Sequence, residues 1–206
     1  MATCKRVTQL PGESAADAAE IAKKIDQGFG GPEFRQLFES AAHEMKAHPT
    51  DEEMIASFRE HRAEFEQLRT MMEQDEGLAR VDPYWTEPED PASIGVPPER
   101  IAEYRSLSKK LALERGVAGF GDKAQRIQFL ASARGLSVSG SSKSFVWLGT
   151  PPQPTETPVI VENLDNHVRQ KQQERSAYFD KHKRRMSGSI HAFREIEPHW
   201  YLEYAE

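Results

Sequence analysis

The sequence predicts an α+β fold in which amino-terminal helices pack on a small antiparallel sheet made of two carboxyl-terminal hairpins. Apolar residues recur at spacings of three and four up to about residue 115, and they alternate with polar residues from about residue 126 onward. Helices first and strands last are typical of this class, because an α/β fold would alternate them along the chain. The 206 residues are 37% hydrophobic and include 10 Phe, 3 Trp and 5 Tyr, which suffices for a core although the mean hydropathy is −0.71.

The chain divides into a helical amino-terminal arm at 1–48 and an α+β domain at 49–206. Two short helices are expected in the arm, separated by glycines and by Pro32, a residue suited to the first turn of a helix. His48 and Pro49 close the arm, and a new helix signal follows at once. We therefore expect the arm to be separable from the domain.

The clearest helix signal begins at Thr50. Glu53 lies three residues further on, where its side chain can return to the cap amide in a capping box. His61 and Arg62 interrupt the middle of the apolar stripe, and Gly77 is the expected stop. The stripe consists of Met54, Ile55, Phe58, Phe65, Leu68, Met71 and Met72. The sequence thus predicts one acidic, amphipathic helix over 50–76.

A proline-rich stretch at 81–98 follows and predicts a stiff surface loop, with Tyr84 and Trp85 as candidate anchors or binding groups. A second good helix is predicted over 98–115, since a proline opens it and Gly116 ends it.

Two hairpins are predicted in the second half of the chain. A strand is predicted at 126–133. The first hairpin comprises strands at 136–139 and 144–148 around a turn at 140–143, and the second comprises 189–197 and 200–206. Between them, 167–186 holds seven Lys or Arg residues against two acids, a balance of +5. We interpret this basic insertion as a solvated helix or mobile segment, because it offers few apolar anchors.

Charge and cysteine content exclude several classes of protein. The net charge of −6 argues against a wholly basic nucleic-acid binder, and a single cysteine excludes an intrachain disulfide or a multi-cysteine zinc site. No apolar run approaches the roughly 18–20 residues of a membrane helix. Only three residues precede Cys4, so the sequence as it stands predicts a cytoplasmic protein, and a periplasmic or envelope-associated one if an export segment was removed.

Several blocks of the chain resemble a family of small uncharacterised bacterial lipoproteins. The blocks are TDEEMIASFREHRAEFEQLRTMMEQDEGLARV (50–81), DPASIGVPPERIAEYRSL (90–107), FLASARGLSVSGSSKSFVWL (129–148) and FREIEPHWYLEYAE (193–206). The resemblance covers about 50–148 and 189–206, and it implies an envelope-facing α+β domain without an assigned activity. No catalytic residues follow from it. The chain departs from the family by its arm, by the basic insertion and by the lack of an apolar segment before Cys4, the family's lipid-bearing cysteine.

The serine-rich segment 137–144 carries the main chemical alternatives. GLSVSG is similar to the nucleophile elbow G-x-S-x-G, but Ser139 replaces the second glycine and strand-forming residues follow. A phosphate loop is also excluded, because Ser141 stands where lysine is required. Gly140, Ser141, Ser142 and Lys143 could still present amides, hydroxyls and one positive charge to an anion.

Other candidates are weaker. Ser106 and Lys109 match a serine–lysine motif without its companion motifs, and the seven histidines show no metal-ligand spacing. His191 could pair with Glu195 or Glu197, but neither spacing gives close geometry on a strand. The sequence therefore predicts no catalytic residue, metal or cofactor.

The leading hypothesis is a non-enzymatic binding or interaction protein with a protein partner, of the immunity or envelope-accessory type. The alternatives are a hydrolase using the hairpin serines at 137–144, and a weak anion or nucleic-acid binder acting through 167–186. The basic run has few aromatic residues for stacking on bases, which argues against nucleic acid. The candidate binding residues are Arg134, Ser141, Ser142, Lys143, Tyr84, Trp85, Lys181, Lys183, Arg184 and Arg185.

Overall fold

A computed structural model describes residues 47–121, 125–134, 140–152, 159–182 and 188–206. The predictions for the arm up to residue 46, for Ser137 and Ser139, and for the basic residues at 183–185 lie outside these ranges. The described helices are α3 (Asp51–Glu60), α4 (Arg62–Gln74), the 3₁₀ turn η1 (Pro91–Ile94), α5 (Pro98–Lys110) and α6 (Leu164–His182). Among the described residues, no helix is long and apolar enough to cross a membrane.

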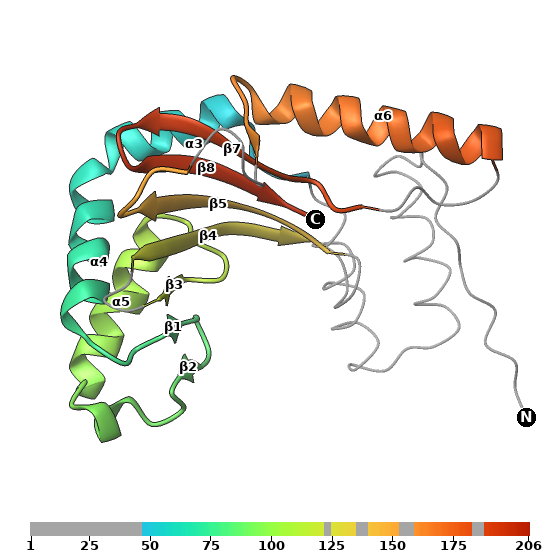
Figure 1. The fold of residues 1–206 in the computed structure, drawn as a ribbon. Coiled ribbons are helices and arrows are strands. Elements are labelled where there is room, and N and C mark those ends of the chain that lie inside the picture. Colours follow the sequence, from blue (N-terminus) through green and yellow to red (C-terminus); the bar gives the residue numbers. More distant parts are fainter. Residues whose placement is uncertain (1–46, 122–124, 135–139, 153–158, 183–187) are drawn as a thin grey trace, which may run out of the picture. The chain divides into compact units, whose positions relative to one another are not determined.

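In the part of the chain that the structure describes, eight strands form one mixed sheet, in the order β2-β1-β3-β4-β5-β8-β7-β6 (Figure 1). All neighbouring strands pair antiparallel except β6 and β7, which are parallel. The strands are β1 (Arg80–Val81), β2 (Thr86–Glu87), β3 (Val117–Phe120), β4 (Arg126–Arg134), β5 (Ser141–Leu148), β6 (Val159–Ile160), β7 (His191–Glu197) and β8 (Trp200–Ala205).

The predicted fold, a small antiparallel sheet of two hairpins, is therefore wrong. The sheet is larger and mixed, and it begins as early as Arg80 in the chain. The added strands are short: β1, β2 and β6 have two residues each, too few for an alternating pattern to show in the sequence. Backbone hydrogen bonding to a neighbour defines them, and Gly116 lets β3 approach β1, since a Cβ there would lie 1.9 Å from the Val81 carbonyl oxygen.

The helix predicted over 50–76 is also wrong in detail, because it breaks at His61. The capping box between Thr50 and Glu53 is present at the start of α3. His61 leaves helical geometry with φ −112° and ψ 27°, and α4 restarts after it. The break brings Phe58 and Phe65 together, with ring centroids 5.2 Å apart. The second helix, predicted to 115, ends at Lys110.

The core lies between the sheet and helices α3, α4 and α5, which cover one face (Figure 1). We call this the inner face. Phe58 and Phe65 from the helices pack there on Phe129, Phe145 and Trp200 from the strands, and all five are buried. Burying each such ring stabilises the fold by roughly 2–3 kcal/mol, so this aromatic cluster fixes how the helices lie on the sheet.

The opposite face, the outer face, carries a smaller apolar cluster and several buried polar groups. Val146, Phe193 and Tyr201 are buried in that cluster, and Ser144 and Glu203 lie beside them on the same strands. Alternation along β5 explains this arrangement, since Phe145 points to the inner face and Val146 to the outer one.

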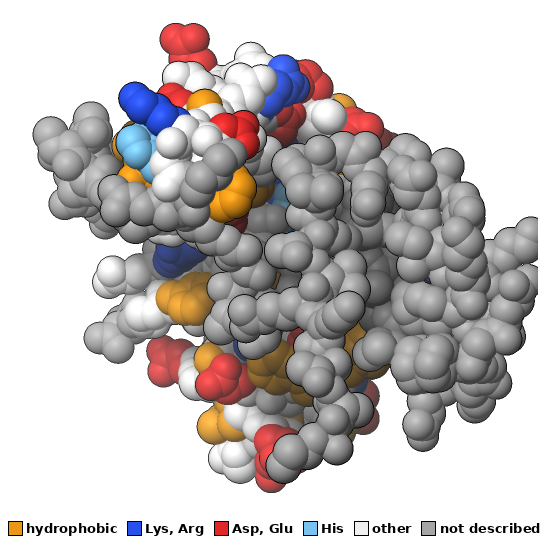
Figure 2. All heavy atoms as spheres, turned by 90° about the vertical axis from the view of Figure 1, so that its right-hand side faces the viewer, with side chains coloured by type: hydrophobic (Ala, Val, Ile, Leu, Met, Phe, Trp, Pro, Cys, Tyr) orange, Lys and Arg blue, Asp and Glu red, His pale blue; other side chains and the backbone are white. Residues whose placement is uncertain are grey.

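Helix α6 begins against the core and then runs past the ends of the strands (Figure 1). Its only residue that is fully buried is Leu164, and Val168 packs partly on the core. The exposed end of α6, at the top of Figure 2, shows basic, acidic and apolar side chains intermixed rather than one continuous basic surface. Within its described part, the basic segment is thus the solvated helix that its composition favours.

Candidate functional site

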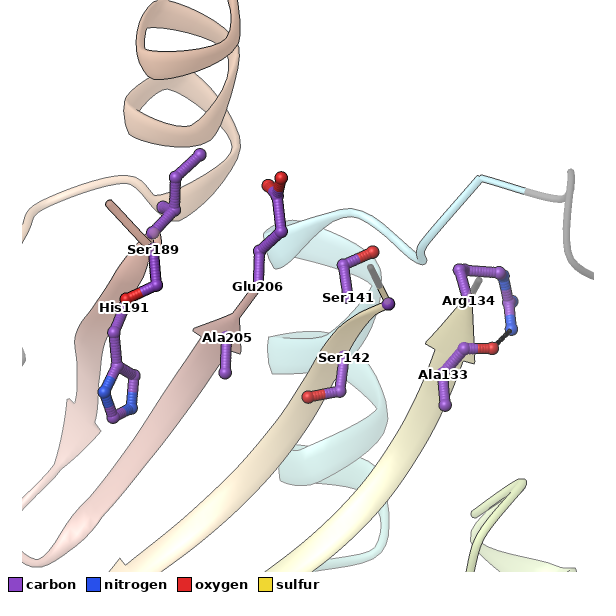
Figure 3. A pocket seen from close by; sticks show the side chains of 10 residues that line it. Ala133, Arg134, Ser141, Ser142, Ser189, His191, Ala205 and Glu206 are labelled. Atoms are coloured by element: carbon purple, nitrogen blue, oxygen red, sulfur yellow. Dashed lines mark hydrogen bonds between the residues drawn. The ribbon is translucent and has the colours of Figure 1, made fainter. Parts of the chain in front are cut away.

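A pocket among the described residues lies where β4, β5, β8 and β7 meet at one end of the sheet (Figure 3). Its volume is about 510 Å³. Four residues lie in one transverse register row across these strands, in the order Ala133, Ser142, Ala205 and His191. The two alanines leave space between larger side chains. The wall is formed by Ala133, Arg134, Gly140, Ser141, Ser142, Ser189, Ile190, His191, Ala205 and Glu206.

A buried carboxylate orients His191 in the pocket wall. His191 Nε2 lies 2.6 Å from Glu203 Oε1, and Glu203 is 1% exposed. Glu203 also accepts hydrogen bonds from Arg126 Nη2, at 2.7 and 2.8 Å, and from Gln128 Nε2, at 2.9 Å. We call Arg126, Gln128, His191 and Glu203 the Glu203 cluster. The ion pair with Arg126 offsets the free-energy cost of burying this carboxylate.

The state of the imidazole follows from this contact. A charged carboxylate only accepts hydrogen bonds, so Nε2 of His191 must carry the proton that it donates to Glu203. In the neutral ring, Nδ1 is then an acceptor. The partner of His191 is neither Glu195 nor Glu197 but Glu203, a diagonal neighbour on the adjacent strand.

The charged side chains of the pocket wall are engaged in ion pairs. Arg134 donates to both carboxylate oxygens of Glu114, at 2.6 and 3.1 Å. Glu206 accepts from Arg175 Nη1 of α6 at 2.6 Å. Figure 3 shows Ser142 and His191 on one side of the sheet and Ser141 and Arg134 toward the other. The wall therefore offers hydroxyls and an imidazole beside charges that are already balanced.

Lys143, a predicted binding residue, does not face the pocket. It is 1% exposed on the inner face, and its ammonium lies 2.8 Å from Asp51 Oδ1, 2.6 Å from Asp165 Oδ1 and 2.8 Å from the Pro49 carbonyl oxygen. Asp51 Oδ2 in turn accepts from Arg194 Nη1 at 2.8 Å. We call Asp51, Lys143, Asp165 and Arg194 the Lys143 cluster, and it joins α3, β5, α6 and β7.

The Lys143 cluster keeps Asp51 ionised. Burial by itself would raise the pKa of Asp51, but hydrogen bonds from Lys143 and Arg194 outweigh it, so the pKa lies below its usual value. The Lys143 ammonium donates hydrogen bonds to Asp165 and to the Pro49 carbonyl oxygen, and it forms an ion pair with Asp51. Lys143 therefore holds segments of the fold together.

The other predicted binding residues lie away from the pocket. Tyr84 is 89% exposed and Trp85 44% exposed in the turn between β1 and β2, with the Arg80 guanidinium 4.8 Å from the Trp85 ring centroid. A second hollow of about 270 Å³ lies beside α5, but neither aromatic residue lines it. Lys181 is exposed near the end of α6. The pocket thus unites Arg134, Ser141 and Ser142 from the predicted set and leaves out Lys143, Tyr84, Trp85 and Lys181.

Two contacts of His48 at this end of the sheet are not predictable from the sequence pattern. His48 Nε2 lies 2.8 Å from Ser141 Oγ, and His48 Nδ1 lies 2.6 Å from Ser132 Oγ. His48 was assigned to the arm, and 93 residues separate it from Ser141. No spacing rule within one segment could have found this pair, nor the contact of His191 with Glu203.

Comparison of the chain with protein-family models, curated proteins and solved structures gave no match. The resemblance to the lipoprotein family therefore stays a prediction. Within the described ranges, no group of three or more His, Cys, Asp and Glu side chains could hold a metal ion.

Proposed function

We propose that this protein binds a small, uncharged, polyhydroxylated molecule in the pocket at the ends of β4, β5, β8 and β7. The observation that carries the proposal is the position of His191, which a fully buried carboxylate holds in the wall of a pocket of about 510 Å³. Oriented polar groups in a concave site with apolar neighbours are the usual design of small-molecule sites.

The chemistry of the wall supports the class of ligand. The hydroxyls of Ser141, Ser142 and Ser189 can each donate and accept, and His191 Nδ1 can accept. Arg134 and Glu206 already balance Glu114 and Arg175, which favours a neutral ligand over a strongly charged one. A polyol satisfies these groups because each of its hydroxyls also donates and accepts.

Titration with a panel of glycerol, myo-inositol, glucose, acetate and inorganic phosphate tests the proposal. We expect one of the polyols to raise the melting temperature saturably and to shift the amide resonances of 140–142 and 189–191. The variants Ser142→Ala and His191→Gln should weaken that binding at least tenfold. Ser106→Ala on the exposed side of α5 is the matched control and should bind as the wild type does.

Two results would contradict the proposal. Either no polyol binds, or the polyol binds equally to Ser142→Ala and to the wild type. Tight binding of phosphate with no polyol response would favour the anion-binding interpretation of Gly140 to Lys143 instead.

A further inference from the structure

Ser141 has the surroundings of a nucleophile. Its Oγ lies 2.8 Å from His48 Nε2, and the other ring nitrogen, Nδ1, lies 2.6 Å from Ser132 Oγ. Ser141 lines the pocket, whereas Ser132 is buried at 1% exposure. A hydroxyl in contact with a base that a third group orients is the arrangement that activates serine for covalent catalysis.

His48 is able to accept a proton at neutral pH. Burial, together with the positive charges of Arg134 and Lys143, lowers the pKa of His48 from 6.5 to about 4. The ring is therefore neutral at pH 7, and when Nδ1 donates to Ser132, Nε2 is the acceptor that faces Ser141. Arg134 lies directly opposite Ser141 on β4, but its charge is balanced by Glu114, so we assign it no role in stabilising an oxyanion.

We propose that Ser141 is an acyl-accepting nucleophile and His48 its general base, so that the protein hydrolyses carboxylic esters of the molecule that the pocket binds. This inference rests on the proposed function for the identity of the alcohol part. It adds a reaction and two catalytic residues to that function.

The reaction balances without a cofactor. Ser141 Oγ forms a bond to the ester carbonyl carbon while its proton passes to His48 Nε2. The carbon–oxygen bond to the alcohol then breaks, and the proton moves from His48 to the departing alkoxide. Water attacks the acyl-serine with the same proton transfers, which releases a carboxylic acid and restores Ser141.

A purely structural role for His48 would also give the two hydrogen bonds, since they tie the segment before α3 to the sheet. Such a tie predicts no reaction, and it does not account for the position of Ser141 in a pocket wall. Because the strength of a base falls with its pKa, we expect slow turnover and choose an activated ester as the probe.

The experiment uses the full chain with p-nitrophenyl acetate, followed by intact-mass and peptide analysis, and a fluorophosphonate probe in parallel. We expect one acetyl group on Ser141, an early release of p-nitrophenol, and a loss of at least 100-fold in acylation rate in Ser141→Ala and His48→Gln. Ser106→Ala is the control and should acylate normally. Melting curves establish that each variant is folded.

The pH profile separates catalysis from structure. Acylation should persist down to about pH 5, because His48 stays neutral until about pH 4. An ordinary histidine would lose its basicity below about pH 6.5. The charged or titratable groups that face His48 are Glu114, Arg134, Lys143, Asp165 and Tyr204.

Absence of acylation at Ser141 in the wild type, or equal acylation in His48→Gln, would overturn the inference. His48 does not line the pocket, so His48→Gln should still bind the polyol. Polyol binding without acylation refutes this inference alone, and acylation without polyol binding refutes the proposed function.

Discussion

Lys143 and Glu203 are two fully buried charged residues on adjacent strands, and they have different roles. Lys143 holds parts of the fold together, whereas Glu203 orients a residue of the pocket wall. Lys143 pairs in register with Tyr204, so Glu203 lies one residue away and points to the other face of the sheet. On the inner face, Lys143 meets two carboxylates and a carbonyl. On the outer face, Glu203 meets Arg126, Gln128 and a histidine that lines a pocket.

The difference lies in where each cluster ends. The members of the Lys143 cluster bond one another, and these bonds hold α3, α6 and β7 against β5. Contacts of the Glu203 cluster end at His191, whose second ring nitrogen is an acceptor in a pocket wall. Of these two buried charges, we therefore take as the sign of a ligand site the one whose hydrogen bonds lead to a residue that lines a pocket.

Removing the charge of Lys143 should have the largest effect on stability. In Lys143→Met, Asp51 stays buried and loses its main partner, which should lower the free energy of unfolding by about 3–5 kcal/mol. Urea unfolding followed by tryptophan fluorescence measures this loss. Lys181→Met, which removes an exposed lysine, is the control. A loss below about 1 kcal/mol for Lys143→Met would show that the Lys143 cluster does not fasten the fold.

Glu203→Gln should lower the free energy of unfolding less than Lys143→Met does, and it should weaken ligand binding in the pocket. The Arg126 side chain is 32% exposed and can be solvated when its partner loses charge, so we expect a loss of about 1–3 kcal/mol. In the wild type, long-range ¹H–¹⁵N spectra should show His191 protonated at Nε2. The variant should lose this single tautomer and weaken polyol binding. An unchanged tautomer would mean that Glu203 does not orient His191.

His48 should make stability depend on pH. Its pKa is about 4 in the folded protein and about 6.5 in the unfolded chain. Between these values the unfolded state binds a proton that the folded state does not, so the free energy of unfolding falls as pH drops from 6.5 to 4. Below about pH 4 both states are protonated and this contribution stops changing.

The size of the effect is moderate because the ring is partly exposed. We expect a loss of about 1–2 kcal/mol across the window after allowing for solvent screening. Urea unfolding at several pH values, in the wild type and in His48→Gln, measures it, and the difference between the two curves cancels the titration of carboxylates. Parallel curves would show that the pKa of His48 is not lowered.

Local signals in the sequence predict local structure well. The capping box at Thr50 is present, and Trp200, Leu202 and Tyr204 share the inner face as their alternation predicts. Both features depend on residues a few positions apart. The whole sheet could not be predicted, because β6 pairs parallel with a strand some 30 residues later and carries no periodic pattern of its own.

In the candidate site, too, the sequence predicts local features but not contacts between distant segments. The turn predicted at 140–143 is wrong, because Ser141 and Ser142 lie in β5, but these serines were recognisable as chemistry-bearing, and with Arg134 they line one pocket. The two histidines near these serines lie in distant parts of the sequence. His48 lies 93 residues from Ser141, and the register of β7 and β8 determines the partner of His191. Spacing along one strand offered only Glu195 and Glu197 and gave close geometry for neither, because the partner Glu203 lies across the strands.

Substitutions at the far end of α6 should have the smallest effect on the free energy of unfolding. Only the start of this helix belongs to the Lys143 cluster. Leu164 and Asp165 attach the start of α6 to the core, and Arg175 bonds Glu206 and the Gly188 carbonyl. Beyond Arg175 the helix is largely exposed, so Lys181→Glu should change the free energy of unfolding by less than about 0.5 kcal/mol. Arg175→Ala should lower it by about 1 kcal/mol, since the loss of a partly buried ion pair also frees Glu206. A loss of about 1 kcal/mol in both variants, measured by urea unfolding, would mean that the whole of α6 folds as part of the domain.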